Sequence, residues 1–392
     1  MFENSFQIGK SGRLSLGVDF GSRSTKILLL NQVGDRIDIQ AAGSFTNPES
    51  GVKNGVIVEP KEFGKKLAHY LSEISIQCDT AVFDVPSNLA VLRWVNLPDL
   101  EGQELREAAK FKVRKHLPFP LESAYIEVSR KSDEFERDVP SLIVAVPKKI
   151  IDSRAETILN AGIIPIRAEL EAQAILRIVE RKLNRKSALW RDASLTIIVF
   201  GATNTHMYVV QNQQLQFIRG VKFGSAMFHD AVSQALNVTA DEAEVMLHDP
   251  FTKLNDNGIL TVPYENSFAL VNLTSELEKL TKEVWRLMRY FRSLHPERSY
   301  AGILDQAVLV GGLVGLSGFA VYLEQKLGLR IEFARPIAGM MTRFNQETFA
   351  NVSNRQEAYT VVMGLALAGL SQNELTRSQA EGAREYNWIR AA

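Results

Sequence analysis

Cysteine is almost absent from this chain: among 392 residues, only Cys78 carries a thiol. A single cysteine excludes an intrachain disulfide, and one thiol in a chain of this length is typical of a reducing compartment. The length and the 45% apolar content are enough to bury more than one core. We therefore expect two or three domains.

An excess of charge of one sign is also missing. Lysine and arginine together number 45, aspartate and glutamate together number 45, and the formal net charge is zero. Proteins that bind nucleic acid usually carry a basic excess that neutralises phosphates, so the sequence predicts no nucleic-acid partner. One basic run, at Lys110, Lys112, Arg114 and Lys115, is interpreted as the solvated face of a helix.

Long uninterrupted apolar runs are lacking as well. The first residues are polar, with an early Glu3, and have no apolar core of the kind found in a signal peptide. The segment 306–323 is uncharged and approaches the length of a membrane span, but glycines interrupt its middle. This pattern predicts a buried strand, a glycine turn and a helix start. We therefore expect a cytoplasmic chain that meets a membrane only through a partner.

Two segments of the chain resemble each other. Leu14–Leu30 and Leu195–Gln211 each read as an apolar strand, a short polar turn after a glycine, and a second apolar strand. Gly21 aligns with Gly201 and Thr25 with Thr205, an offset of about 180 residues that suits duplicated domains.

The rest of the chain alternates between helical and strand patterns. Helices are predicted at 62–74, 100–116, 148–161, 168–184, 225–236, 240–247, 273–294 and 359–370, strands at 81–86, 141–146, 307–310 and 331–333, and a turn-rich stretch at 249–268. Strands alternating with helices, twice over, indicate an α/β protein of two lobes with mixed sheets. A cleft between two such lobes is a usual place for a small ligand.

The first turn combines an acid, a glycine, hydroxyls and a cation. Its residues are Asp19, Gly21, Ser22, Arg23, Ser24, Thr25 and Lys26. The glycine permits a tight turn and a close approach of phosphate to backbone N–H groups. Asp19 suits a magnesium ion that keeps most of its waters. An ordinary polar hairpin turn is the alternative, and the duplicated turn favours the phosphate interpretation.

The second turn departs from the first at one position. Gly201, Ala202, Thr203 and Asn204 can face a phosphate, but the position equivalent to Asp19 is Val199. Because no carboxylate stands there to organise a metal ion or an attacking water, the second turn is predicted to bind phosphate without helping to cleave it.

Two further groups of residues are candidate nucleoside contacts. Gly311, Gly312 and Leu313 follow a strand and precede a helix, a pattern that lets backbone pass close to a ring or a ribose. Glu283 and Arg286 share one face of a long helix, where they are predicted to reach a nucleoside. The simpler alternatives are a tight turn and a solvated charged face.

These motifs occur in the order of the actin, Hsp70 and sugar kinase superfamily. Within it the chain resembles the PilM family of type IV pilus proteins and, more distantly, FtsA. The nearer resemblance rests on Gly55–Pro60, Leu97-Pro98, Glu104–Lys112, His116–Glu122 and Leu287–Ser293. It implies an actin-like (ribonuclease H-like) duplicated fold, in which a subdomain called 1C replaces the 1B subdomain of actin.

The resemblance also implies a division of the chain. An N-terminal extension covers 1–13, subdomain 1A takes 14–80 plus 359–375, subdomain 1C takes 81–166, a linking helix 167–192, subdomain 2A 193–222 plus 301–358, subdomain 2B 223–300, and a C-terminal tail 376–392.

The function implied by the resemblance is a cytoplasmic scaffold that binds ATP and Mg²⁺. Such proteins hold the N-terminal peptide of the membrane protein PilN in a groove between 1A and 1C, and form a homo-oligomeric ring with other pilus platform or motor proteins. Val199 indicates weak or absent ATPase activity. The alternatives are an active phosphotransferase, with Asp84 as a conceivable second carboxylate, and a cell-division protein similar to FtsA.

Overall fold

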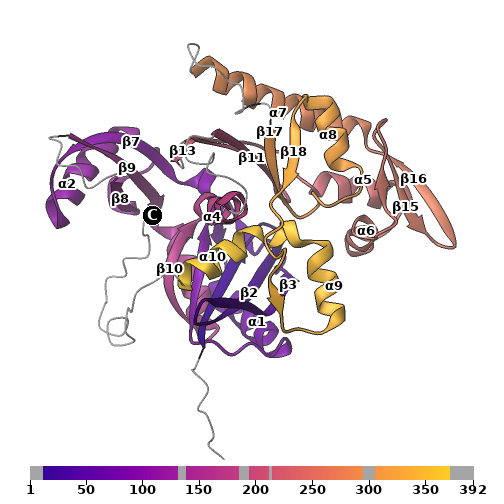
Figure 1. Ribbon diagram of the computed structural model, residues 1–392, viewed down its shortest axis with the longest axis horizontal. Coiled ribbons are helices and arrows are strands. Elements are labelled where there is room, and N and C mark those ends of the chain that lie inside the picture. Colours follow the sequence, from indigo (N-terminus) through magenta and orange to yellow (C-terminus); the bar gives the residue numbers. More distant parts are fainter. Residues whose placement is uncertain are drawn as a thin grey trace, which may run out of the picture.

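The computed structural model describes residues 12–130, 138–184, 194–211, 214–294, 304 and 306–370. Among these residues, two large mixed sheets form the centres of two lobes. Figure 1 shows the first lobe below, the second lobe above it, and two helices between the sheets.

The sheet of the first lobe has six strands in the order β10-β6-β1-β2-β3-β19. Their bounds are Arg13–Phe20 (β1), Ser24–Val33 (β2), Arg36–Thr46 (β3), Thr80–Val85 (β6), Ile164–Leu170 (β10) and Met341–Thr342 (β19). The hairpins β1–β2 and β2–β3 are antiparallel, whereas β6, β10 and β19 join in parallel. The end of β1 is buried throughout, because helices cover both faces of the sheet.

Two pairs of helices cover this sheet. Helices α1 (Pro60–Glu73) and α3 (Lys148–Asn160) share one core with side chains of β1 and β6, while α4 (Glu171–Asn184) and α10 (Thr360–Leu370) pack on the other face. Helix α3 ends before Gly162, whose φ of +79° suits a glycine. Helix α10 is buried on every side, which confirms the prediction for 359–370.

The sheet of the second lobe has the order β13-β12-β11-β17-β18. Its strands are Ser194–Phe200 (β11), Thr205–Gln211 (β12), Gln214–Val221 (β13), Gln306–Gly311 (β17) and Arg330–Phe333 (β18). Helices α7 (Thr274–Leu294) and α8 (Phe319–Leu327) cover one face. The other face packs onto α4 and α10, so Ile197 and Tyr208 share a core with Ile175 and Val362. The two lobes are therefore joined by a continuous apolar core.

Smaller units complete the molecule. Helix α2 (Gly102–Val113) packs on a three-stranded sheet, whose strands are β7 (Val91–Pro98), β9 (Asp138–Pro147) and β8 (Ala124–Arg130). Helices α5 (Ala226–Leu236) and α6 (Ala240–Leu247) lie beside a second three-stranded sheet, whose strands are β14 (Lys253–Leu254), β15 (Ile259–Tyr264) and β16 (Ser267–Asn272). The hairpin of β4 (Val52–Lys53) and β5 (Val56–Ile57), and α9 (Gln346–Asn354), belong to the first lobe.

Three expected boundaries, two between subdomains and one at the start of a helix, differ from the observed strand pairing. Strand β6 was expected in subdomain 1C, but it pairs with β1 in the first sheet, and so does β10 through β6. Strand β19 was expected in subdomain 2A, but it pairs with β3. The helix predicted over 168–184 begins at Glu171, because residues 168–170 complete β10. In each case the paired strands are far apart in the chain, and the pattern of apolar residues within one segment does not reveal such a pairing.

The turn-rich stretch 249–268 forms a small antiparallel sheet. It contains β14, β15 and the start of β16, and Leu260 and Val262 alternate inward from β15. Its turn residues mark hairpin turns between these strands. The interpretation of 306–323 as strand, turn and helix is confirmed by β17 and α8. Within the described ranges, no helix combines the length and apolarity needed to cross a bilayer.

Substitution of Gly364 by alanine is expected to destabilise the protein by about 2 kcal/mol. A Cβ atom at this position of α10 would lie 2.1 Å from the backbone oxygen of Ala174 in α4, so the two helices must move apart. Thermal or urea unfolding measures the loss. Gly315→Ala is the control, because its added Cβ would come no nearer than 3.5 Å to another atom. Equal stability of the two variants would contradict the close packing of α4 on α10.

Candidate nucleotide site between the lobes

The two glycine turns have the same pairing register. In the first hairpin Asp19 pairs with Lys26 and Phe20 with Thr25; in the second, Val199 pairs with His206 and Phe200 with Thr205. The predicted duplication is therefore confirmed at the level of individual residues. It also shows that the acid and the cation of the first hairpin are both replaced, by Val199 and His206, in the second.

The turns meet where the lobes face each other. The Thr203 hydroxyl donates a hydrogen bond to the Ser22 hydroxyl over 3.2 Å, and the Asn204 amide donates to Thr203 over 2.9 Å. The structure thus brings together the two turns that the sequence predicted as phosphate sites, from positions about 180 residues apart in the chain.

Residues of the first turn have different roles. Thr25 is fully buried and its hydroxyl donates to the Asn47 side chain over 2.8 Å, while the Asn47 amide donates to the Gly21 carbonyl over 2.8 Å. Thr25 therefore shapes the turn from its buried side, where its hydroxyl is already engaged. The Lys26 ammonium donates to Ser24 over 3.2 Å at the edge of the turn.

Three carboxylates gather at one edge of the first sheet. Asp19 lies near the end of β1, Asp84 near the end of β6, and Glu171 directly after β10. Because these three strands run parallel and are neighbours, their carboxyl ends meet, and one oxygen from each side chain lies within 4.8 Å of the others. Asp19, predicted from the sequence as a candidate magnesium ligand, therefore lies in a cluster of three acids.

Burial strongly perturbs two of these acids. Burial raises the pKa of Asp19 to about 7; the Lys26 charge lowers that pKa and the Asp84 charge raises it further. Burial, followed by the charges of Asp84 and Asp19, raises the pKa of Glu171 to about 8. Near neutral pH the cluster therefore holds protons that an added cation would displace.

Asp84 is held by a buried cation and by the backbone at the start of the first turn. Its Oδ1 accepts a hydrogen bond of 2.8 Å from the Phe20 N–H, and its Oδ2 lies 3.4 Å from Nε of Arg154, with both side chains fully buried. Arg154 also donates to the backbone oxygens of Gly55 and Ile150. Asp84 therefore positions the start of the first turn.

The cluster fits a magnesium ion. Mg²⁺ takes hard oxygen ligands and usually only one or two carboxylates, the remaining positions being water and phosphate. Among the described residues, the buried Oδ2 of Asp84 accepts no hydrogen bond, and Asp19 and Glu171 carry raised pKa values that an ion would relieve. Asp19 and Glu171 are the residues that would hold the ion, directly or through water.

The second turn is built from backbone. The Ser225 N–H donates to the Gly201 carbonyl and the Ala226 N–H to the Ala202 carbonyl, both over 2.9 Å, so the start of α5 is fastened to the turn. A Cβ at Gly224 would lie 2.4 Å from the Ala202 oxygen, so glycine is required there. Burial lowers the pKa of His206 to about 4, so this ring is neutral at physiological pH. No ionised group stands beside Val199 on its hairpin.

The glycine pair after β17 lies next to the second turn. Gly311 pairs with Phe200, has a φ of +136°, and would place a Cβ 2.0 Å from the Phe200 oxygen. Only glycine suits that position. Gly312 has open space where a Cβ would be. The side chain of Leu313 is buried in the core between the second-lobe sheet and α7 and α8, so it anchors the turn.

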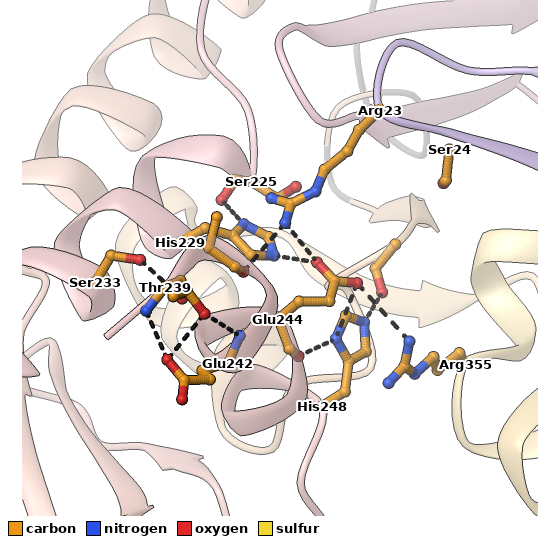
Figure 2. Close-up of polar contacts among 12 residues, drawn as sticks. Arg23, Ser24, Ser225, His229, Ser233, Thr239, Glu242, Glu244, His248 and Arg355 are labelled. Carbon is orange, nitrogen blue, oxygen red and sulfur yellow. Dashed lines mark hydrogen bonds and ion pairs between the residues drawn. The ribbon is translucent and has the colours of Figure 1, made fainter. Parts of the chain in front are cut away.

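A charged cluster absent from the predictions lies across the lobes, around Glu244 of α6 (Figure 2). One oxygen of Glu244 lies 2.5 Å from Nε2 of His229 and 3.6 Å from Arg23, and the other lies 3.5 Å from His248 and 3.7 Å from Arg355. Arg23 also donates to the Ala240 carbonyl over 3.3 Å. An arginine of the first turn thus ties the first lobe to α6 of the second.

Glu244 is firmly ionised. Burial would raise its pKa, but the His229 hydrogen bond and the charges of His248, His229 and Arg23 outweigh burial and lower the pKa to about 2. His248 also lies 3.3 Å from the Gly312 carbonyl, next to the predicted nucleoside turn. An ionised carboxylate at this place can accept hydrogen bonds from hydroxyl groups of a ligand. The sequence signal was the spacing of Glu244 and His248 on one helix face.

The predicted contacts Glu283 and Arg286 are not brought to this site. They form an ion pair of 2.8 Å with each other on α7, and the Arg286 side chain is 66% exposed. Between them, Trp285 donates to the Lys326 carbonyl near the end of α8, whereas the glycine turn precedes the start of α8. The two residues therefore lie toward the far end of α8, away from the glycine turn.

A sequence family described as "Type IV pilus assembly protein PilM" matches residues 17–370 of this chain. The chain belongs to the PilM family. It is 20% identical over 350 residues to cell division protein FtsA of Streptococcus pneumoniae serotype 2 (strain D39 / NCTC 7466), covering 82% of this chain and 75% of FtsA.

One solved structure shows the fold class of the PilM-family chain. The chain superposes on the "PilM-PilN type IV pilus biogenesis complex" with a TM-score of 0.73 and 19% identity, covering 91% of this chain and 99% of that one. MreB 5 of Spiroplasma citri, solved bound to AMPPNP, gives a TM-score of 0.48 at 12% identity, covering 90% and 94%. The fold is the actin-like duplicated α/β fold predicted from the sequence. The β7–β9–β8 sheet with α2 is the subdomain in the place called 1C.

Proposed function

We propose that this PilM-family protein is an ATP-binding scaffold of the type IV pilus machine. Phosphates would lie between the turn at Gly21 and the turn at Gly201, with Mg²⁺ beside Asp19 and Glu171. The nucleoside would lie against Gly311 and Gly312. The observation that carries this proposal is the meeting of the two turns at the Ser22–Thr203 hydrogen bond, beside a carboxylate cluster.

Turnover of ATP is proposed to be slow. The first lobe supplies carboxylates, but the second lobe offers Val199 and a neutral His206 where an acid and a cation stand in the first. The test is calorimetry with Mg²⁺ and ATP, with phosphate release followed in the same samples. Tight binding with little phosphate release supports a scaffold; release at many turnovers per second would instead support the phosphotransferase alternative.

The partner is proposed to be the N-terminal peptide of a PilN-like membrane protein. It would bind where the first lobe meets the β7–β9–β8 sheet, and the protein would form a ring with further pilus platform or motor proteins. The support is family membership and the likeness to a structure titled as a PilM–PilN complex. The protein would then sit in the cytoplasm, held at the inner membrane by its partner.

Substitution of Val58 by glutamate is expected to weaken capture of such a peptide at least tenfold. Val58 follows β5 and is 48% exposed, and the β4–β5 turn contacts Leu89 ahead of β7. A charge there would have to be buried under an apolar peptide side chain. Fluorescence polarisation with the labelled peptide measures the affinity. Val321→Glu on α8, a valine 49% exposed, is the matched control. Equal loss in both variants would count against this junction as the binding place.

A further inference from the structure

The end of α2 carries an exposed aromatic ring within a basic surface. The Phe111 side chain is 79% exposed, more than any other exposed large apolar residue of the described ranges. Lys112 follows it on α2, and Arg114 and Lys115 follow in a 3-10 turn, Arg114–His116; all three are exposed. We call Phe111, Lys112, Arg114 and Lys115 the α2 tip.

The α2 tip is locally cationic in a chain of zero net charge. Residues 107–116 hold four lysines or arginines and one acid, a net charge of 4 − 1 = +3 with His116 neutral. That acid, Glu107, is already paired with Lys110 over 2.7 Å. The next acid toward the other end, Glu104, lies seven residues from Phe111, about 10 Å along the helix. Cations at the C-terminal end of a helix interact favourably with the helix dipole, but the dipole does not explain why an aromatic ring is exposed at Phe111.

One side of α2 packs within its own subdomain. Ala109 and Val113 are buried against Leu97 of β7 and Ile143 of β9, which fixes the opposite side of the helix toward solvent. Figure 1 shows α2 at the left extreme of the molecule, away from the meeting of the lobes. A flat surface can therefore approach the α2 tip without touching the nucleotide site.

We propose that the α2 tip docks directly on a bilayer surface of anionic phospholipids. Phe111 would enter the boundary between headgroups and acyl chains, and Lys112, Arg114 and Lys115 would lie against lipid phosphates. Proteins that bind single-stranded nucleic acid usually do so in a basic groove lined with stacking aromatic rings. The α2 tip is instead a helix end at the periphery, which favours a membrane surface. The contact goes beyond the expectation that the membrane is reached only through a partner, and it does not depend on nucleotide or peptide binding.

The contact would act together with the partner. Each basic residue near an anionic surface raises partitioning about fivefold, so three cations and one ring give weak binding on their own. Once a membrane-anchored partner holds the protein nearby, a second weak contact becomes effective because its local concentration is high. It would also orient the β7–β9–β8 sheet toward the membrane.

The test uses the full chain and vesicles that contain no protein. Co-flotation is measured with vesicles of phosphatidylcholine alone and with phosphatidylglycerol added, at low and high salt. Wild type should float with the anionic vesicles only, and less at high salt. The double variant Lys112→Gln/Arg114→Gln should bind about 25-fold more weakly. Its control is Lys61→Gln/Lys65→Gln on α1, which removes the same charge from exposed positions elsewhere and should bind like wild type.

A second pair of variants tests the ring. Phe111→Ser should lower anionic-vesicle binding severalfold, while Phe251→Ser, a phenylalanine 72% exposed in the second lobe, should not. Equal binding to neutral vesicles, no binding of wild type, or no difference between the α2 variants and their controls would each overturn the proposal. The proposal would also be overturned if the protein bound single-stranded RNA more tightly than the vesicles, and if the Lys112→Gln/Arg114→Gln variant lost that RNA binding.

Discussion

Replacing Asp19 by alanine is expected to weaken the binding of Mg²⁺ and ATP by roughly 30- to 100-fold, the equivalent of about 2–3 kcal/mol. Asp19 is the acid of the first hairpin itself, and one oxygen each of Asp84 and Glu171 lies within 4.8 Å of its carboxylate. Without it, the ion and the phosphates it carries lose a charged ligand that the second lobe does not replace, because the equivalent position is Val199.

Calorimetry above pH 8, where the cluster is ionised, measures the loss directly. A thermal shift with ATP should shrink in parallel, since ligand binding stabilises the folded state by mass action. Asp35→Ala is the matched control, because Asp35 is exposed in the β2–β3 turn. If Asp19→Ala binds Mg²⁺ and ATP as wild type does, then the metal ion is not held by the first lobe, and the site proposed above is wrong.

The predictable part of the site was the part encoded by neighbouring residues. The two glycine turns and the Gly311–Gly312 pair lie at strand ends that apolar pattern alone reveals, and the duplication aligns them. The same local logic predicted α3, α6, α8 and α10 with small errors at their ends. It also gave the mixed α/β lobes, since strands alternated with helices in both halves.

The rest of the site depends on pairings that no local pattern contains. Glu171 enters the carboxylate cluster only because β10 joins β6, and the apolar pattern of residues 168–184 does not separate the end of β10 from α4. Glu244 meets Arg23 and Arg355 from positions far apart in the chain. Conversely, the spacing of Glu283 and Arg286 correctly predicts that they share one face of α7. Spacing alone does not show that this part of α7 lies beside the end of α8 rather than beside its start, where the glycine turn is.

Stability without nucleotide is expected to fall as the pH rises from about 6.5 to about 9, by roughly 2–3 kcal/mol. Burial raises the pKa of Asp19 to about 7 and that of Glu171 to about 8, both above the values of unfolded carboxyls. In this window the folded state holds protons that the unfolded state has released, so each step up in pH favours unfolding. Below it, the lowered pKa values of His206 and His248 act in the opposite direction, so the fall is largely offset there.

The variant Glu171→Gln isolates this effect. It removes the carboxyl with the highest raised pKa in the cluster and one of the like charges around Asp19, so its stability should exceed that of wild type above pH 8 and depend less on pH. Chemical denaturation at several pH values measures both curves, with the exposed Glu49→Gln as a control that should follow wild type. Mg²⁺ added above pH 8 should stabilise wild type by neutralising the cluster, and should stabilise Glu171→Gln much less. A wild-type curve that is flat across the window, unchanged by Glu171→Gln, would mean that the three acids are hydrated and lie further apart than 4.8 Å.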